Sequence, residues 1–181
     1  MALIVEDGSG VDGADSFSSL EDARAIATNY GLSLDADDTL AEIQLRKAYL
    51  GLQSSEKDLQ GSRTHDTQTG IFPREGIYSN CVEVDSESIP NAVIMAQINF
   101  ADAINGGYDT NEVDNGQNLA GFSTVNGVYS ETYQDGSTTK TNSTIQGVYN
   151  SLYPFTLQGY AASPCGRAAG FGGLVKEDYF A

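Results

Sequence analysis

Residues 89–107 constrain the fold more than any other segment, because their pattern predicts a helix that is apolar around most of its circumference. Ser88 and Pro90 predict the start of this helix, and Gly106-Gly107 predicts its end. The apolar residues within it are Val93, Ile94, Ala96, Ile98, Phe100, Ala101 and Ile104. A helix that is apolar on most sides must be covered by other elements. We therefore expect it to be the central helix of the core.

A first helix is predicted over residues 20–30. It follows Ser18-Ser19-Leu20-Glu21, which has the form of a capping box, and it ends at Gly31. The residues that recur at helical spacing are Leu20, Ala23, Ala27 and Tyr30, and we expect them to face the core.

A second helix is predicted from Asp37 or Asp38 to about Ser54-Ser55, because carboxylates suit the positive N-terminal end of a helix. Its expected buried residues are Leu40, Ile43, Ala48 and Leu52. Arg46 and Lys47 lie toward its end, and we expect them to complement the negative C-terminus of the helix.

Short extended segments flank these helices. Residues 2–5 are apolar and predict a strand, and residues 81–85 alternate between apolar and polar, so we expect the two segments to pair. Cys81 and Cys165 are the only cysteines. They are too few for a disulfide scaffold or a tetrahedral zinc site, and we expect two free thiols.

The composition becomes polar after Tyr108. Residues 122–125 and 128–133 predict a β-ribbon around the turn Asn126-Gly127, with a further β-prone segment at residues 138–141 after Asp135-Gly136. A final helix is expected from Asn142 or Ser143 to a boundary at Pro154. Its expected apolar residues are Ile145, Val148, Tyr149 and Leu152.

These elements predict a mainly α protein, with a small helical-bundle core, a β-ribbon insertion and extended termini. We divide the chain into residues 1–108 (helical core with an N-terminal strand and a central loop), residues 109–160 (polar linker, ribbon and final helix) and residues 161–181 (a flexible C-terminal arm). The arm is rich in glycine and carries Phe171, Leu174, Tyr179 and Phe180. Terminal disorder and ordering against a neighbouring surface explain this composition equally well.

The net charge of the chain and the motifs that it lacks narrow the range of possible functions. The net charge is −16, from 25 acidic and 9 basic residues, which argues against nonspecific nucleic-acid binding, since Lys and Arg drive that binding. An acidic surface does suit a channel through which DNA must pass without sticking. His65 is the only histidine, and no nucleophile elbow, phosphate loop or calcium loop is present. We expect no catalytic residues, no cofactor and no metal.

No apolar stretch is long enough to span a membrane, and the chain begins without a signal-peptide pattern, so we expect no membrane partner.

The segment of greatest interest is the loop with Gly61-Ser62-Arg63-Thr64 and Gly70 to Gly76. Arg63 and Arg74 are the only basic residues between Lys57 and Lys140. They can pair with acids in the same subunit or in an adjoining one. If they join subunits, Arg74→Glu impairs assembly more than folding.

Four elements in order carry a family resemblance. They are Gly13-Ala14-Asp15-Ser16-Phe17, Gly61-Ser62-Arg63-Thr64 with Gln68, Phe72-Pro73-Arg74-Glu75-Gly76, and Ile89-Pro90. The chain resembles a family of tailed-phage head-tail adaptors, or head-completion proteins, in which a tryptophan stands at the position of Phe72. Members of this group are also labelled DnaT-like single-stranded-DNA-binding proteins.

The adaptor resemblance implies a ring, usually a dodecamer, at the virion neck, made in the host cytoplasm. Its partners would be further copies of the chain, the portal protein and tail or nozzle proteins, with packaged DNA passing through the channel unbound. The alternative is a single-stranded-DNA-binding replication protein, which should be basic along a groove. The acidic charge favours the adaptor. The expected protein-interface residues are Arg63, Phe72, Arg74, Tyr129, Tyr133, Phe171, Leu174, Tyr179 and Phe180.

Overall fold

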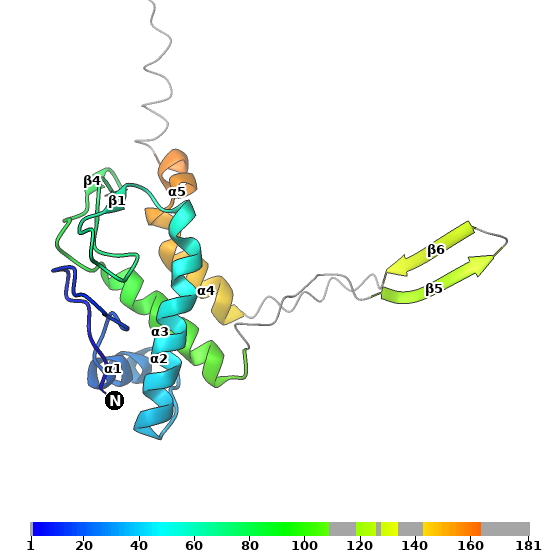
Figure 1. Ribbon diagram of the computed structural model, residues 1–181, viewed down its shortest axis with the longest axis horizontal. Coiled ribbons are helices and arrows are strands. Elements are labelled where there is room, and N and C mark those ends of the chain that lie inside the picture. Colours follow the sequence, from blue (N-terminus) through cyan, green and yellow to red (C-terminus); the bar gives the residue numbers. More distant parts are fainter. Residues whose placement is uncertain (1, 109–118, 126–127, 134–142, 164–181) are drawn as a thin grey trace, which may run out of the picture.

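The computed structural model describes residues 2–108, 119–125, 128–133 and 143–163 (Figure 1). Its α-helices are α1 (Leu20–Tyr30), α2 (Asp38–Leu52), α3 (Asn91–Asn105), α4 (Ser143–Leu152) and α5 (Leu157–Ala162), and its 3-10 helices are η1 (Gln53–Asp58) and η2 (Tyr153–Phe155). The strands pair antiparallel as β1 (Ser62–Arg63) with β2 (Arg74–Glu75), β3 (Tyr78–Ser79) with β4 (Val82–Glu83), and β5 (Leu119–Val125) with β6 (Val128–Tyr133). The described chain is mainly α, as predicted.

Helix α3 is the central helix, as its composition predicts. It packs against α1, α2 and α4, and Figure 1 shows these helices around it. Val93 and Ala96 belong to one hydrophobic cluster, while Ile98 and Ala101 belong to a second, and all four are fully buried. One helix therefore connects both parts of the core.

Helix α1 is capped by Ser19, whose Oγ accepts a hydrogen bond from the Asp22 amide at 3.1 Å. Gly31 ends the helix in the left-handed region, with φ of 69°. Small residues, Ala23 and Ala27, make its buried face. Tyr30 is 68% exposed, so the prediction that it faces the core is wrong. It is the last helical residue and lies at the exposed end of α1.

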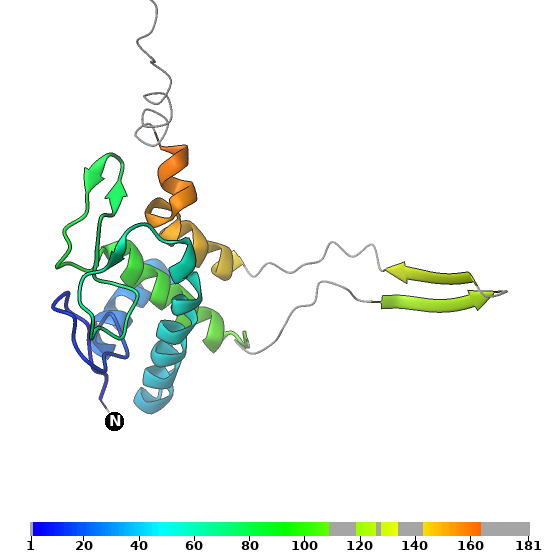
Figure 2. The same cartoon turned by 45° about the horizontal axis from the view of Figure 1, so that its top comes forward.

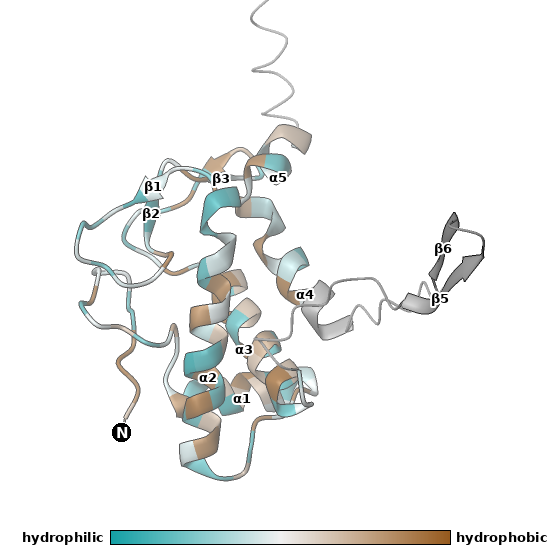
Figure 3. Cartoon of the chain, turned by 45° about the vertical axis from the view of Figure 1, so that its right-hand side comes forward, coloured by the Kyte–Doolittle hydropathy of each residue, from teal (hydrophilic) through white to brown (hydrophobic). Residues whose placement is uncertain are grey.

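Helix α2 starts after Asp37, whose carboxylate accepts from the amides of Thr39 and Leu40. Its fully buried apolar residues are Ala41, Leu45, Ala48, Tyr49 and Leu52. The predicted burial of Leu40 and Ile43 is wrong, since both lie on the exposed side. Figure 3 shows hydrophobic and hydrophilic residues alternating along this helix. Leu40 and Ile43 give a stronger hydropathy signal than Ala41, which the structure buries in their place.

Arg46 lies in the middle of α2 and forms an ion pair with Asp15, with Nε and Oδ2 2.6 Å apart. Its predicted role at the end of the helix is therefore wrong. The Asp15 side chain also accepts a hydrogen bond from the Ile4 amide at 2.7 Å. This pair ties the N-terminal segment to α2.

The described part of the N-terminal segment forms a single isolated parallel bridge, between Val5 and Ser16, in place of the predicted strand. The predicted pairing of residues 2–5 with residues 81–85 is wrong, because β4 pairs with the adjacent β3. Asn80 and Cys81 form the turn between them with φ of 50° and 67°. A local hairpin closes at a smaller entropic cost than a contact across the whole core. Cys81 is disulfide-bonded, so the expectation of a free thiol is wrong there.

Strands β5 and β6 form the predicted hairpin, with Val125 opposite Val128 and Leu119 opposite Tyr133. Figures 1 and 2 show this hairpin standing apart from the helical body. The predicted strand at residues 138–141 lies outside the described residues.

The chain returns to the core at α4, which packs against α3. Val148, Leu152 and Phe155 are buried in the same cluster as Val93. Tyr149 is 57% exposed, so the prediction that it faces the core is wrong. Residues 143–163 thus share a core with residues 2–108. The short helix α5 was not predicted from the sequence. No helix in the described ranges is both long enough and apolar enough to span a bilayer.

Candidate protein-interaction site

The central loop, residues 59–80, lies between η1 and α3 and contains three of the predicted interface residues. Its two arms meet in the β1–β2 pair, where Ser62 faces Glu75 and Arg63 faces Arg74. Gly61 enters this pair with φ of 62°, and a Cβ there would collide with the carbonyl oxygen of Glu75. The close approach of the two backbones requires glycine at this position.

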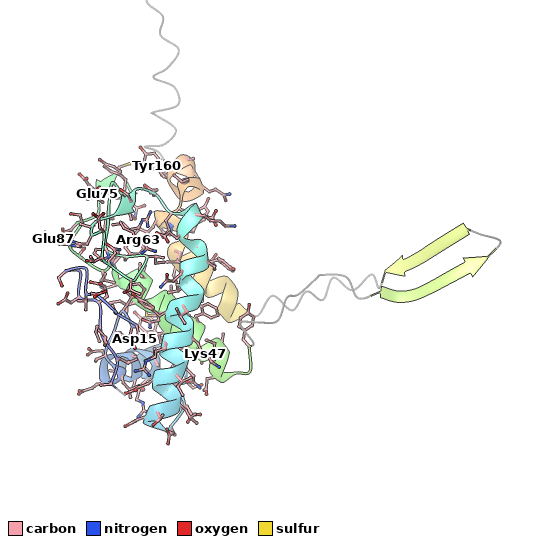
Figure 4. All side chains as sticks on the ribbon, in the orientation of Figure 1. Asp15, Lys47, Arg63, Glu75, Glu87 and Tyr160 are labelled. Atoms are coloured by element: carbon pink, nitrogen blue, oxygen red, sulfur yellow. The ribbon has the colours of Figure 1, made fainter. Side chains whose placement is uncertain are left out.

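Arg63 forms a two-pronged ion pair with Glu56 of η1. Its Nε and Nη2 donate to the two carboxylate oxygens, each at 2.7 Å, and its Nη1 donates to the Gln68 carbonyl at 3.0 Å. The hydrogen bond from Arg63 lowers the pKa of Glu56 below its usual range. Both side chains keep about a third of their surface exposed. Figure 4 shows Arg63 between the loop and the upper part of α2.

Arg74 lies deeper, with 5% of its side chain exposed. Its Nε donates to the Gln60 carbonyl at 2.9 Å and its Nη2 to the Gly61 carbonyl at 2.8 Å. Its Nη1 makes longer contacts of 3.4 Å with the Ile71 carbonyl and the Glu56 carboxylate. Burial lowers the pKa of Arg74, yet a guanidinium stays charged in proteins. This cation therefore holds the loop backbone from the inside.

Phe72 is fully buried and packs edge-to-face on Phe155, with ring centroids 5.7 Å apart. Gln60 adds polar contacts at the same junction. Its backbone amide donates to the Phe155 carbonyl at 2.9 Å, and its side-chain amide donates to the carbonyls of Pro154 and Thr156. The central loop is thereby joined to the η2–α5 segment.

The structure brings Arg63, Phe72 and Arg74 together, and all of their described contacts lie within one subunit. They set the shape of the loop, and their part in an interface between subunits stays a prediction. Arg74→Glu would place a carboxylate among backbone carbonyls and beside Glu56, so we expect it to destabilise the fold as well. That it impairs assembly more than folding stays a prediction.

The other predicted interface residues lie away from this loop. Tyr129 and Tyr133 are in β6, opposite Thr124 and Leu119, and no contact of their side chains is described. Phe171, Leu174, Tyr179 and Phe180 lie outside the described residues.

Sequence reasoning missed the residues that organise the loop, Glu56 and Gln60. Glu56 belongs to the polar run 53–58, which has the composition of a solvent-exposed segment. Sequence reasoning also missed Gln97 in α3. It is fully buried in α3, accepts from the Phe17 amide at 2.8 Å, and donates to Ser16 Oγ and the Leu45 carbonyl at 3.0 Å each. Only the positions of these partners in space show the need for a polar side chain.

Basic side chains elsewhere in the described ranges follow the same pattern. Arg24 pairs with Asp38 at 2.9 Å, and Arg46 pairs with Asp15. Among the described residues, all four arginines are thus neutralised inside the subunit. Lys47 and Lys57 are the described lysines, and both are exposed. Within these ranges no group of three or more His, Cys, Asp or Glu side chains is arranged to hold a metal ion.

A family model described as "Putative DnaT-like ssDNA binding protein" matches residues 1–168. The chain belongs to this family. The DnaT-like match includes the helical body, the hairpin and α5, and it ends before Phe171. Comparisons with curated proteins and with solved structures gave no significant match. The label DnaT-like single-stranded-DNA-binding protein is confirmed as the family, and the head-tail adaptor role stays a prediction.

Proposed function

We propose that this DnaT-like protein is a non-catalytic head-tail adaptor of a tailed-phage virion. Copies of the chain form a closed ring at the neck, between the portal and the tail or nozzle proteins, and the ring surrounds the DNA channel. The resemblance of the motif order to head-completion proteins supports this role. The observation that carries it is the use of all four described arginines inside the subunit.

The charges of the protein support a role in which DNA passes through the ring, and they argue against tight binding of DNA. A single-strand binder needs a row of Lys or Arg along the backbone path, with aromatic rings that stack on bases. The chain carries −16, and the described arginines already face carboxylates or carbonyls. Such a surface repels phosphate groups, which suits a channel wall.

The β5–β6 hairpin supports an assembly role in a different way. It stands apart from the helical body in Figures 1 and 2, and a two-stranded hairpin is marginally stable by itself in water. A neighbouring subunit or the portal would supply the surface against which it packs. Heterologous contacts of this kind close into rings when the rotation between copies allows it.

The family description favours a second candidate, binding of single-stranded DNA. The exposed Lys47 and Lys57 and the tyrosines of β6 would then contribute charge and stacking. The family description supports this candidate, and the charge and ion pairing of the described residues support the adaptor.

Two measurements on the full chain separate the candidates. Mass photometry, alone and with purified portal, tests for a ring. Fluorescence anisotropy with a labelled oligonucleotide across a salt series tests for DNA binding, whose affinity should fall steeply with salt. Rings with no DNA binding at low salt support the adaptor. Monomers that bind the oligonucleotide with a steep salt slope refute it and establish the second candidate.

Matched variants sharpen both tests. Residues 119–133 can be replaced by a short Gly-Ser link, because Leu119 and Tyr133 are paired and the two ends of the excised segment are adjacent. For the adaptor, this excision abolishes ring or portal association and leaves the helical circular-dichroism signal unchanged. Lys47→Glu with Lys57→Glu is the converse control. This double change weakens DNA binding if the second candidate holds.

A further inference from the structure

The turn between β3 and β4 carries a cysteine that is covalently bonded. Cys81 follows Asn80 in this turn, has a φ of 67°, and is exposed. Its sulfur is part of a disulfide. The sequence holds one other cysteine, Cys165, which lies two residues after Ser163, the last residue described. Within one chain, Cys165 is therefore the partner that the sequence offers to Cys81.

Contacts among the described residues bring these two parts of the chain together. The ring of Tyr78 in β3 packs against the ring of Tyr160 in α5, with centroids 6.2 Å apart, and Figure 3 shows β3 next to α5. Gln60 reinforces the contact, because its Oε1 accepts from the Tyr78 amide at 3.0 Å. Its Nε2 donates to the carbonyls of Tyr78 and Thr156 at 3.1 and 3.3 Å. The β3–β4 turn and α5 thus lie side by side for reasons other than the disulfide.

The end of α5 leaves Cys165 within reach of this turn. Ser163 is held at the helix end, where its amide donates to the carbonyls of Gly159 and Tyr160 at 3.1 and 3.0 Å. Two further residues span at most about 7 Å, and Cys81 comes only three residues after Tyr78. Disulfide-bonded residues have Cα atoms about 4–7 Å apart. The paired tyrosines therefore place both cysteines where one bond can join them.

We propose that Cys81 and Cys165 form a reversible disulfide that fastens the start of the C-terminal arm to the β3–β4 turn. The bond closes by exchange with a small-molecule disulfide such as oxidised glutathione. One cysteine thiolate attacks this oxidant, forms a mixed disulfide and releases the first small thiolate, and the other cysteine thiolate then displaces the second. The two protein thiols lose two protons and two electrons, and the electrons reduce the oxidant to two thiols.

The exposure of Cys81 makes this bond responsive to its surroundings. Exposed disulfides are the more easily reduced ones, so a reducing medium opens the bond and an oxidising medium closes it. When closed, it forms a covalent ring from residue 81 to residue 165 that contains α3, α4 and α5. A ring of that length restricts the unfolded chain and so stabilises the folded one. The inference is independent of the adaptor role, since it concerns a bond inside one subunit.

Peptide mapping of the full chain tests the bond directly. The protein is equilibrated with oxidised glutathione, alkylated under denaturing conditions and digested with trypsin. Cleavage after Arg74, Lys140 and Arg167 leaves the two cysteines in separate peptides, residues 75–140 and 141–167. A joined pair of these peptides, from protein that runs as a monomer on a non-reducing gel, supports the proposal. Separately alkylated peptides after oxidation, or a link found only in a covalent dimer, overturn it.

Thermal melts test what the bond does to the fold. The oxidised protein should melt about 5–10 °C above the reduced protein, because the closed ring is long. The variant with both Cys81→Ser and Cys165→Ser is the control, and its melting temperature should not respond to the ratio of oxidised to reduced glutathione. Equal melting temperatures for the oxidised and reduced wild-type chain contradict a stabilising bond.

Tyr160→Ala tests whether the packing of β3 on α5 holds the cysteines together. Loss of the ring contact should lower the equilibrium constant for closing in a glutathione buffer about two- to tenfold. Tyr78→Ala removes the other ring and should have the same effect. Tyr30→Ala is the matched control, since this tyrosine is 68% exposed at the end of α1 and should leave the constant unchanged. Unchanged constants in Tyr160→Ala and Tyr78→Ala contradict this account of how the cysteines meet.

Discussion

Arg74→Met tests whether the buried arginine holds the central loop together. Methionine keeps the apolar stem and removes the charged head, so the carbonyls of Gln60 and Gly61 lose donors at 2.9 and 2.8 Å. The longer contacts with Ile71 and Glu56, both at 3.4 Å, are lost as well. Removing one partner of a buried charged network costs about 3–5 kcal/mol of unfolding free energy.

The value should lie toward the lower end of that range, since Glu56 keeps its two-pronged ion pair with Arg63 and is 34% exposed to water. About 3 kcal/mol would lower the melting temperature by roughly 6–12 °C for a chain of this size. Arg63→Met should cost less, about 1 kcal/mol, because its ion pair with Glu56 is a third exposed on both sides.

Urea unfolding followed by far-UV circular dichroism measures both values, provided that the m-value is unchanged. Lys57→Met is the control, since this exposed lysine in η1 should shift stability by no more than about 0.5 kcal/mol. If Arg74→Met costs less than Arg63→Met, the assignment of Arg74 as the main internal tie of the loop is refuted.

Three further predictions concern the same core. Gly61→Ala should cost about 2 kcal/mol or more, because its Cβ meets backbone at positive φ, whereas Gly13→Ala, with a similar φ and open space, should cost about 1 kcal/mol; thermal melts compare them. Burial raises the pKa of Tyr49, so its contribution to stability is complete below about pH 10 and is lost above it. Tyr49→Phe should remove that alkaline loss in urea titrations and cost nothing at neutral pH, since the hydroxyl has no partner among the described residues; a loss above about 1 kcal/mol would contradict this. The hydrogen bond from Arg63 depresses the pKa of Glu56, so this pair stabilises the fold above the ordinary value of 4.5 and less as the pH falls below it. Glu56→Gln should flatten that acid-side slope, and an unchanged slope would exclude the pair as its source.

Much of the fold was predictable because its signals are local. Asp37 before α2, Gly31 after α1 and the turn between β5 and β6 each act on neighbouring backbone groups. The burial of α3 was also predictable, because a helix that is apolar on most sides would expose apolar residues to water in any orientation unless other elements covered it.

The candidate site was predictable only in part. Arg63, Phe72 and Arg74 stand out in the sequence as isolated residues of a glycine-rich loop, and they do meet in space. Whether their partners were internal or external could not be read from one chain. Glu56 and Gln60 give both arginines partners within the subunit, and neither carries a sequence signal.

Sequence alone therefore determined the helix ends, the hairpin, the central helix and the acidic charge, because each depends on residue type or on spacing within a few residues. Tertiary structure decided which face of α2 is buried, which strand pairs with β4, and which acid faces each arginine. It also buried Glu6 with one carboxylate oxygen that has no hydrogen-bond partner among the described residues. These outcomes depend on contacts between residues far apart in the chain, where packing and hydrogen-bond geometry choose among partners that the sequence pattern leaves equivalent.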